Sequence, residues 1–134
     1  ERSMIPICME LNVALTPYSP LAAGPLSRLE WTTDTLRSQT DKTAISKYDS
    51  TQESDYGIVK RVDELAEKHN ATMTQIALAW QFAKGVTAPI VGATKAKYFD
   101  DAVGAFDVIL SAEDVAYLEA PYVPHKIVGA LPHA

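Results

Sequence analysis

Apolar residues recur three or four positions apart in several stretches of the chain, the spacing that places side chains on one face of a helix. The pattern predicts a short helix within 1–12 that ends at Asn12. It predicts a longer helix over 55–69, with Ser54 or Asp55 as its N-terminal cap. The apolar stripe of this longer helix comprises Ile58, Val59, Val62, Leu65 and Ala66.

Three more helices are predicted after Asn70. Thr72-x-x-Gln75 and Ser111-x-x-Asp114 are capping-box patterns, in which a hydroxyl and a side chain three residues later satisfy the first backbone N–H groups. The first box opens a helix that Gly85 ends, and the second opens a helix that runs through Glu119. Between them, 97–106 has the spacing of a helix. Its predicted inward-facing residues are Phe99, Ala102, Val103 and Phe106.

Two short apolar runs, 13–17 and 86–91, predict buried strands. Pro17 and Pro20 end the first strand, and Pro89 inside the second requires a bulge or a strand end. The polar stretch 22–54 between the strands has no sustained period, so we expect a long surface loop with room for a short helix near 33–40.

Strands that alternate with helices predict an α/β fold with a parallel sheet. Two strands cannot bury both faces of such a sheet, so further strands are expected in a segment beyond this sequence or in a partner chain. The first residue is Glu1 and not Met. We therefore expect 1–134 to be one unit cut from a longer chain, with 120–134 as its tail.

Composition narrows the class of protein. The 134 residues are 47% hydrophobic and 22% charged, with a net charge of −5. This balance excludes a disordered chain and argues against nucleic acid or an anionic membrane as a partner. No apolar run reaches the roughly 20 residues of a membrane span, and the start lacks the pattern of a signal peptide. The single cysteine, Cys8, fits a reducing compartment, so a cytoplasmic location is expected.

Candidate chemistry lies at the carboxyl ends of the two predicted strands, where parallel α/β folds bind ligands. The segments 18–24 and 92–95 combine small residues, hydroxyls and backbone N–H groups. The second adds Thr94 and Lys95 at a helix start, which is the chemistry of a phosphate site. Turns of this composition are also common as plain helix caps.

Four separated motifs carry a resemblance to a known family. They are VALTPYSPLAAGPL at 13–26, ALAW at 77–80 followed by Gly85, PIVGATK at 89–95, and LEAPYVPHKIVG at 118–129. The first and third resemble the seventh and eighth strands and following loops of the aldo-keto reductases. The motifs occur in the family's order and cover nearly the whole chain. The resemblance implies the C-terminal part of a TIM (β/α)8 barrel, with about two strands and their flanking helices.

The same resemblance implies a site for NADPH. Tyr18 falls where the family stacks an aromatic ring on the nicotinamide. The pyrophosphate loop corresponds to Ser19, Leu21, Gly24, Leu26 and Arg28. The stretch around the adenosine 2′-phosphate corresponds to Gly92, Ala93, Thr94 and Lys95. Near the adenine, Asp101 keeps the family's carboxylate, whereas Tyr98 and Ala102 depart from its pattern. Structural alternatives remain: Tyr18 packing under its loop, and Arg28 and Lys95 as solvated cations.

The family's catalytic Asp, Tyr, Lys and His lie on earlier strands, so no catalytic residue is expected in this chain. Tyr56-Gly57 after Asp49 is too distant to be the family's Asp…Tyr-Gly motif. His69 is expected to serve its helix end, and His125 and His133 lack the spacing of metal ligands, so no metal is predicted.

Three functional hypotheses follow. The first is an NADPH-dependent oxidoreductase segment that supplies the cofactor half of an enzyme for small aldehydes or ketones. The alternative is a non-enzymatic NADPH-binding or interaction module, and the third hypothesis is a structural fragment that binds nothing alone. Each expects the remainder of the barrel, or another copy of the chain, as partner.

Overall fold

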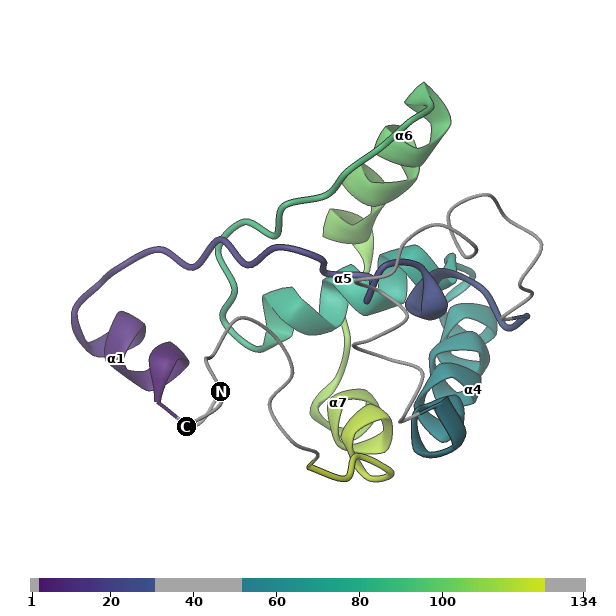
Figure 1. Cartoon of the computed structure of the whole chain (residues 1–134), viewed down its shortest axis with the longest axis horizontal. Helices are drawn as coiled ribbons and strands as arrows, with labels where there is room; N and C mark the ends of the chain where they lie inside the picture. Colours follow the sequence, from purple (N-terminus) through teal and green to yellow (C-terminus); the bar gives the residue numbers. More distant parts are fainter. Residues whose placement is uncertain (1–2, 31–51, 125–134) are drawn as a thin grey trace, which may run out of the picture.

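A computed structural model describes residues 3–30 and 52–124. In these ranges the backbone forms α-helices and two short 3₁₀ turns (Figure 1). In chain order they are α1 (Met4–Glu10), η1 (Pro25–Ser27), α4 (Gln52–His69), α5 (Met73–Ala83), α6 (Ala96–Val103), η3 (Gly104–Asp107) and α7 (Ala112–Glu119). None of these helices is long and apolar enough to cross a bilayer.

The hydrophobic core lies where α4, α5 and α7 pack together. Ile76 of α5 is fully buried at its centre. The core residues around it are Val59, Val62, Leu65, Ala66, Met73 and Leu118. The apolar stripe predicted for 55–69 is thus confirmed as the packing face of α4. Each fully buried aliphatic side chain contributes about 1.5–3 kcal/mol, so this cluster is the main source of stability in the described part.

Helix boundaries follow local chemistry. Both predicted capping boxes are confirmed: Gln75 N–H donates to Thr72 Oγ1 at 3.2 Å, and Asp114 N–H donates to Ser111 Oγ at 3.1 Å. The predicted helix ends are confirmed as well. Asn12 and Gly85 adopt positive φ, of 52° and 84°, and the next residue's N–H returns to a carbonyl five residues back.

The start of α4 corrects one prediction. The helix begins at Gln52, so Ser54 and Asp55 lie in its first turn and are not its cap. The predicted loop 22–54 accordingly ends earlier and contains η1 near its start. The acidic side chains of Glu53 and Asp55 still suit the first turn, where they face the positive end of the helix dipole. The predicted short helix near 33–40 lies outside the described residues.

The two predicted strands are wrong as regular elements, because no strand forms in the described ranges. The segments 13–17 and 86–91 do run side by side, joined by one parallel bridge between Tyr18 and Ile90. The Ile90 N–H donates to the Pro17 carbonyl at 2.9 Å, and Leu15 accepts from Thr87 and Ala88. Prolines remove ladder donors, and neither segment has a second neighbour in the described part that would bury it.

The segment predicted as one helix over 97–106 is also corrected. It consists of α6 and then η3, and Phe99 and Val103 are exposed rather than inward-facing. Phe106 stacks its ring on Phe82 of α5, with the ring centres 4.9 Å apart, but most of its side chain stays exposed. The break falls at Gly104, where the Gln75 amide occupies the space a Cβ would need, 2.3 Å from the ideal position. Helix α6 meets α5 at its C-terminal end and projects from there away from α4 and α7 (Figure 1), so Phe99 and Val103 on it stay exposed.

The apolar faces of α4 and α5 are covered within this chain. Val62, Leu65 and Ile76 lie in the core, and Ile58 and Trp80 pack against it, so these helices need no partner surface for these residues. Many of the exposed large apolar residues lie on α1, along 13–18, and on α6 and η3, and others, such as Ile109, lie outside these segments. Apolar surface is therefore left uncovered on several elements of the described part.

Candidate functional site

The first half of the candidate site is the loop that follows the extended segment 13–17. Its first residue, Tyr18, is 71% exposed, so its ring does not pack under the loop. Two consecutive turns follow: Ala22 N–H donates to the Ser19 carbonyl at 3.0 Å, and Gly24 N–H donates to the Leu21 carbonyl at 2.8 Å. The loop therefore presents one aromatic ring to its surroundings and folds the rest of its backbone tightly.

The backbone of this loop is strained. Ser19, Ala22 and Ala23 have positive φ values of 57°, 51° and 63°, and Gly24 has 129°. For an L-residue such as alanine this conformation costs roughly 1–2 kcal/mol, and it persists only where surrounding contacts hold it. Strain of this kind is characteristic of ligand-binding loops.

Arg28 folds back over the same loop. Its guanidinium lies 3.5 Å from the position a Cβ would take on Gly24. In the part of the chain that the structure describes, its Nε is the buried side-chain polar atom without a hydrogen-bond partner. Such a donor costs free energy unless a ligand or another group satisfies it. Leu26 has a structural role instead, because it is half-buried against the helical core.

The second half of the candidate site surrounds the start of α6. Gly92, Ala93, Thr94 and Lys95 are all exposed, and the space around Gly92 is open. Lys95 takes the cap position with extended backbone, and no side chain caps the helix. The first N–H groups of α6 and the Lys95 ammonium therefore face open space at the same helix end.

Tyr98 is open to contact with a ligand, whereas the Asp101 carboxylate already has a partner within the chain. Tyr98 is exposed, and the Lys97 ammonium lies 5.2 Å from the centre of its ring. Asp101 is half-buried and accepts a hydrogen bond from the Thr72 hydroxyl at 2.8 Å, while its backbone carbonyl accepts from Gln75 at 3.2 Å. Asp101 thus fastens α6 to the cap of α5, a structural role that the sequence did not indicate. Ala102 is half-buried on α6.

The structure brings the two halves together at one point only. The bridge between Tyr18 and Ile90 sets the beginnings of both loops side by side. Beyond it, the N-terminal end of α6 is the end farthest from α4 and α5 (Figure 1), whereas η1 returns toward α5. Two open cavities of about 450 and 660 Å³ are lined by other residues, so neither contains the candidate site.

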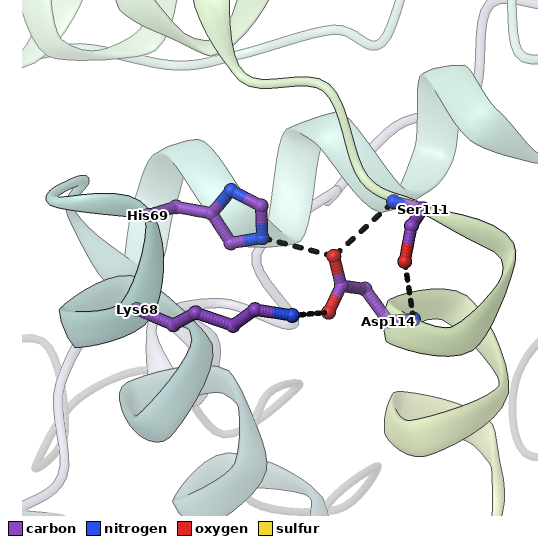
Figure 2. A network of polar contacts seen from close by, with 4 residues as sticks. All are labelled: Lys68, His69, Ser111 and Asp114. Carbon is purple, nitrogen blue, oxygen red and sulfur yellow. Dashed lines mark hydrogen bonds and ion pairs between the residues drawn. The ribbon is translucent and has the colours of Figure 1, made fainter.

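A polar cluster that the sequence did not reveal joins α4 to α7 (Figure 2). Asp114, only 3% exposed, accepts from Lys68 Nζ at 2.6 Å and lies 3.0 Å from His69 Nε2. It also accepts from the Ser111 N–H at 3.2 Å. The Lys68 ammonium leads the interactions that lower the pKa of Asp114 to about 2, against the opposing effect of burial.

This cluster is structural. The Ser111 hydroxyl accepts from the Asp114 backbone and not from His69, so no nucleophile is paired with a base. Lys68 and His69 lie in the last turn of α4, and Asp114 lies in the first turn of α7, where the helix dipole favours a carboxylate. His69 thus has a structural place at its helix end, as predicted. The Ser111 box was visible in the sequence, but nothing local indicates that α4 supplies the partners of Asp114.

A second contact between the same helices involves Tyr117. Its hydroxyl donates to Glu64, which raises the pKa of Tyr117, and Arg61 stacks over its ring at 4.3 Å. Within 3–30 and 52–124, no three His, Cys, Asp or Glu side chains are grouped as a metal site. His125 and His133 lie outside these ranges.

Comparison with known proteins agrees with the resemblance read from the motifs. The profile of the aldo/keto reductase family matches residues 1–122. Versiconal hemiacetal acetate reductase of Aspergillus parasiticus is 42% identical over 95% of this chain and 37% of its own length. A Schizosaccharomyces pombe protein named "putative aryl-alcohol dehydrogenase" is 43% identical over 98% of this chain and 37% of its own. An aldo-keto reductase of Fusarium vanettenii is 37% identical over 96% and 35%.

The chain therefore spans little more than a third of the length of these relatives. The matched segment includes both halves of the candidate site and all the described helices. On this evidence, the chain belongs to the aldo/keto reductase family.

Proposed function

We propose that this chain supplies the nicotinamide-cofactor half of a carbonyl reductase. The observation that carries the proposal is the parallel bridge between Tyr18 and Ile90, which sets the two candidate loops side by side at the ends of parallel segments. That is the place where parallel α/β folds bind ligands. The family's usual nicotinamide cofactors would supply hydride for reduction of an aldehyde or ketone.

The residues present fit such a cofactor in two places. In the first loop, the unpaired Nε of Arg28 and the tight backbone around Gly24 suit a pyrophosphate. At the start of α6, the exposed Thr94 hydroxyl, the Lys95 ammonium and free backbone N–H groups suit a 2′-phosphate. We therefore propose NADPH rather than NADH, with Tyr18 against the nicotinamide and Tyr98 near the adenine.

Four of the predicted residues contribute differently from Arg28, Thr94 and Lys95. Ser19 and Leu21 contribute the carbonyl groups of the two consecutive turns, so their place in the site is through the backbone. Leu26 and Asp101 are held by the core and by Thr72. We therefore assign the polar contacts to Arg28, Thr94 and Lys95, and not to Asp101.

The proposal places the proton-donating residues outside these 134 residues. The rest of a (β/α)8 barrel, or another copy of this chain, would cover the exposed apolar stripe of α6 and pair with the extended segments. The relatives' names, a hemiacetal acetate reductase and a putative aryl-alcohol dehydrogenase, support oxidoreduction between carbonyl and alcohol groups, and we propose an aldehyde or ketone as the substrate. A cytoplasmic location stays a prediction.

Lys95→Ala tests the cofactor assignment in the complete barrel. The variant should weaken NADPH binding by roughly 1.5–3 kcal/mol, the range for a hydrogen bond to a charged group, and leave NADH binding nearly unchanged. Lys60→Ala is the matched control, because Lys60 lies on α4 with its ammonium over the Tyr56 ring. Equal losses for both cofactors would contradict a 2′-phosphate contact at Lys95.

A further inference from the structure

The strained loop 18–24 is anchored to α5 by a buried side chain. Gln81 is 8% exposed, and its Nε2 donates to the Pro20 carbonyl at 2.8 Å, across 61 residues of sequence. Gln81 and Asp114 are the buried polar or charged residues in the described part of the chain. Asp114 joins α4 to α7. Gln81 is the other of these two residues, and its side chain bonds to the loop.

The hydrogen bond from Gln81 reaches the first of two consecutive turns in the loop. Pro20 and Leu21 are the central residues of the turn closed by Ala22 N–H and the Ser19 carbonyl. The next turn, from Leu21 to Gly24, has Ala22 and Ala23 at its centre, both with positive φ. Two consecutive alanines in the left-handed region relax unless something outside the turn fixes its entry. The Gln81 amide fixes that entry at Pro20.

The helix end makes the anchor rigid. The Gln81 carbonyl accepts from Lys84 N–H at 3.1 Å and from Val86 N–H at 3.0 Å, the bonds that close α5 around Gly85. Gln81 thus joins three features: the end of α5, the start of the extended segment after it, and the loop that follows Tyr18. Neighbouring α5 residues Leu78 and Ala79 are buried, so the helix at this point cannot shift freely.

We propose that Gln81 is a positioning residue for the cofactor loop. It holds 19–24 in the strained conformation in which Arg28 and the backbone around Gly24 suit a pyrophosphate. This inference rests on the proposed function for its purpose, but the anchoring itself can be measured without a cofactor. Gln81 touches neither cofactor nor substrate in this proposal. It acts through Pro20.

The first measurement is amide hydrogen exchange in the complete barrel without cofactor. Gln81→Leu should speed exchange at Ala22 and Gly24 about tenfold, because the Pro20 carbonyl loses its donor and the turns open more often. Trp80→Phe, on the same helix as Gln81, is the matched control. It removes the 2.9 Å hydrogen bond from Trp80 Nε1 to Glu119 of α7 and leaves the contact between Gln81 and Pro20 in place. Unchanged exchange in Gln81→Leu, or equal acceleration in both variants, would overturn the anchoring.

The second measurement is NADPH affinity in the complete barrel as a function of pH. Gln81→Glu has no donor when ionised, but its protonated carboxyl can donate to the Pro20 carbonyl. Its affinity should therefore recover relative to Gln81→Leu as pH falls, and comparison at each pH cancels protonation of the cofactor. A constant ratio between these variants would contradict the positioning role. If the loop loosens but the wild-type protein binds no NADPH, the proposed function fails while the anchor stands.

Discussion

Removing the charge of Asp114 should weaken the contact between α7 and α4. This carboxylate is 3% exposed and meets Lys68 at 2.6 Å and His69 at 3.0 Å. Its pKa of about 2 lies below the ordinary value of 3.8, and a shift of that size corresponds to about 2 kcal/mol. Asp114→Asn, which keeps an acceptor for the helix cap, should therefore lower the free energy of unfolding by about 2 kcal/mol at pH 7.

The direction of the pKa shift determines how the free energy of unfolding changes with pH. Because the pKa is lowered on folding, the stabilisation is fully present well above pH 3.8 and is lost as pH falls toward 2. At pH 3 about half of it, roughly 1 kcal/mol, should be gone. Urea unfolding followed by far-ultraviolet circular dichroism at pH 7 and pH 3, at one protein concentration, measures both values.

Matched variants separate this contact from general effects of charge. Lys68→Met should couple to Asp114→Asn in a double-mutant cycle by up to about 1 kcal/mol, since the Lys68 side chain is 59% exposed and partly screened. Lys60→Met, on the same helix but remote from Asp114, should show no coupling. An unfolding difference between wild type and Asp114→Asn that is the same at both pH values would refute this account of the contact.

Three further predictions concern the core, the exposed face and activity. Ile76→Ala should cost about 2–5 kcal/mol of unfolding free energy by denaturant titration, whereas Ile109→Ala, at an 84% exposed position, should change it by less than about 0.5 kcal/mol. The chain alone should self-associate in sedimentation experiments, and Phe99→Glu with Phe106→Glu should shift it toward monomer; wild type that stays monomeric would contradict an uncovered apolar face. The pure chain should oxidise no NADPH with aldehydes or quinones, and turnover abolished by Tyr56→Phe would show that the chain holds a proton donor.

Features with a local chemical cause could be predicted from the sequence. The capping boxes at Thr72 and Ser111 depend on residues three positions apart, and the ends at Asn12 and Gly85 depend on residues that tolerate positive φ. The stripe of α4 follows from helical spacing. The start of α4 was missed because Ser54 and Asp55 suit both a cap and a first turn.

Features that depend on distant partners could not be predicted in this way. Whether 13–17 forms a strand is decided by neighbours on both sides, and the described chain offers one bridge to 86–91. The inward face assigned to Phe99 was a property of the sequence pattern, but burial requires a surface to pack on. The contacts of Asp114 and Gln81 span 45 and 61 residues, so spacing gives no sign of them.

The two loops of the candidate site followed from the predicted strand ends, whereas the roles of single residues came from the family motifs. Arg28 and Lys95 lie in two separate loops of the sequence. The spacing around Lys95 fits both a phosphate site and an ordinary helix cap. The structure adds the strain at Ala22 and Ala23 and the unpaired Nε of Arg28. These two observations give the first loop a physical reason to bind an anion.

The central claim is that 18–28 and 92–101 form one nicotinamide-cofactor site. The most direct test is a map of backbone amide chemical shifts in the complete barrel during titration with NADPH. We predict the largest shifts at Tyr18, Gly24, Arg28 and the start of α6, with little change on α4 and α7. Shifts confined to α4 and α7, or saturable binding that leaves both loops unperturbed, would contradict the claim.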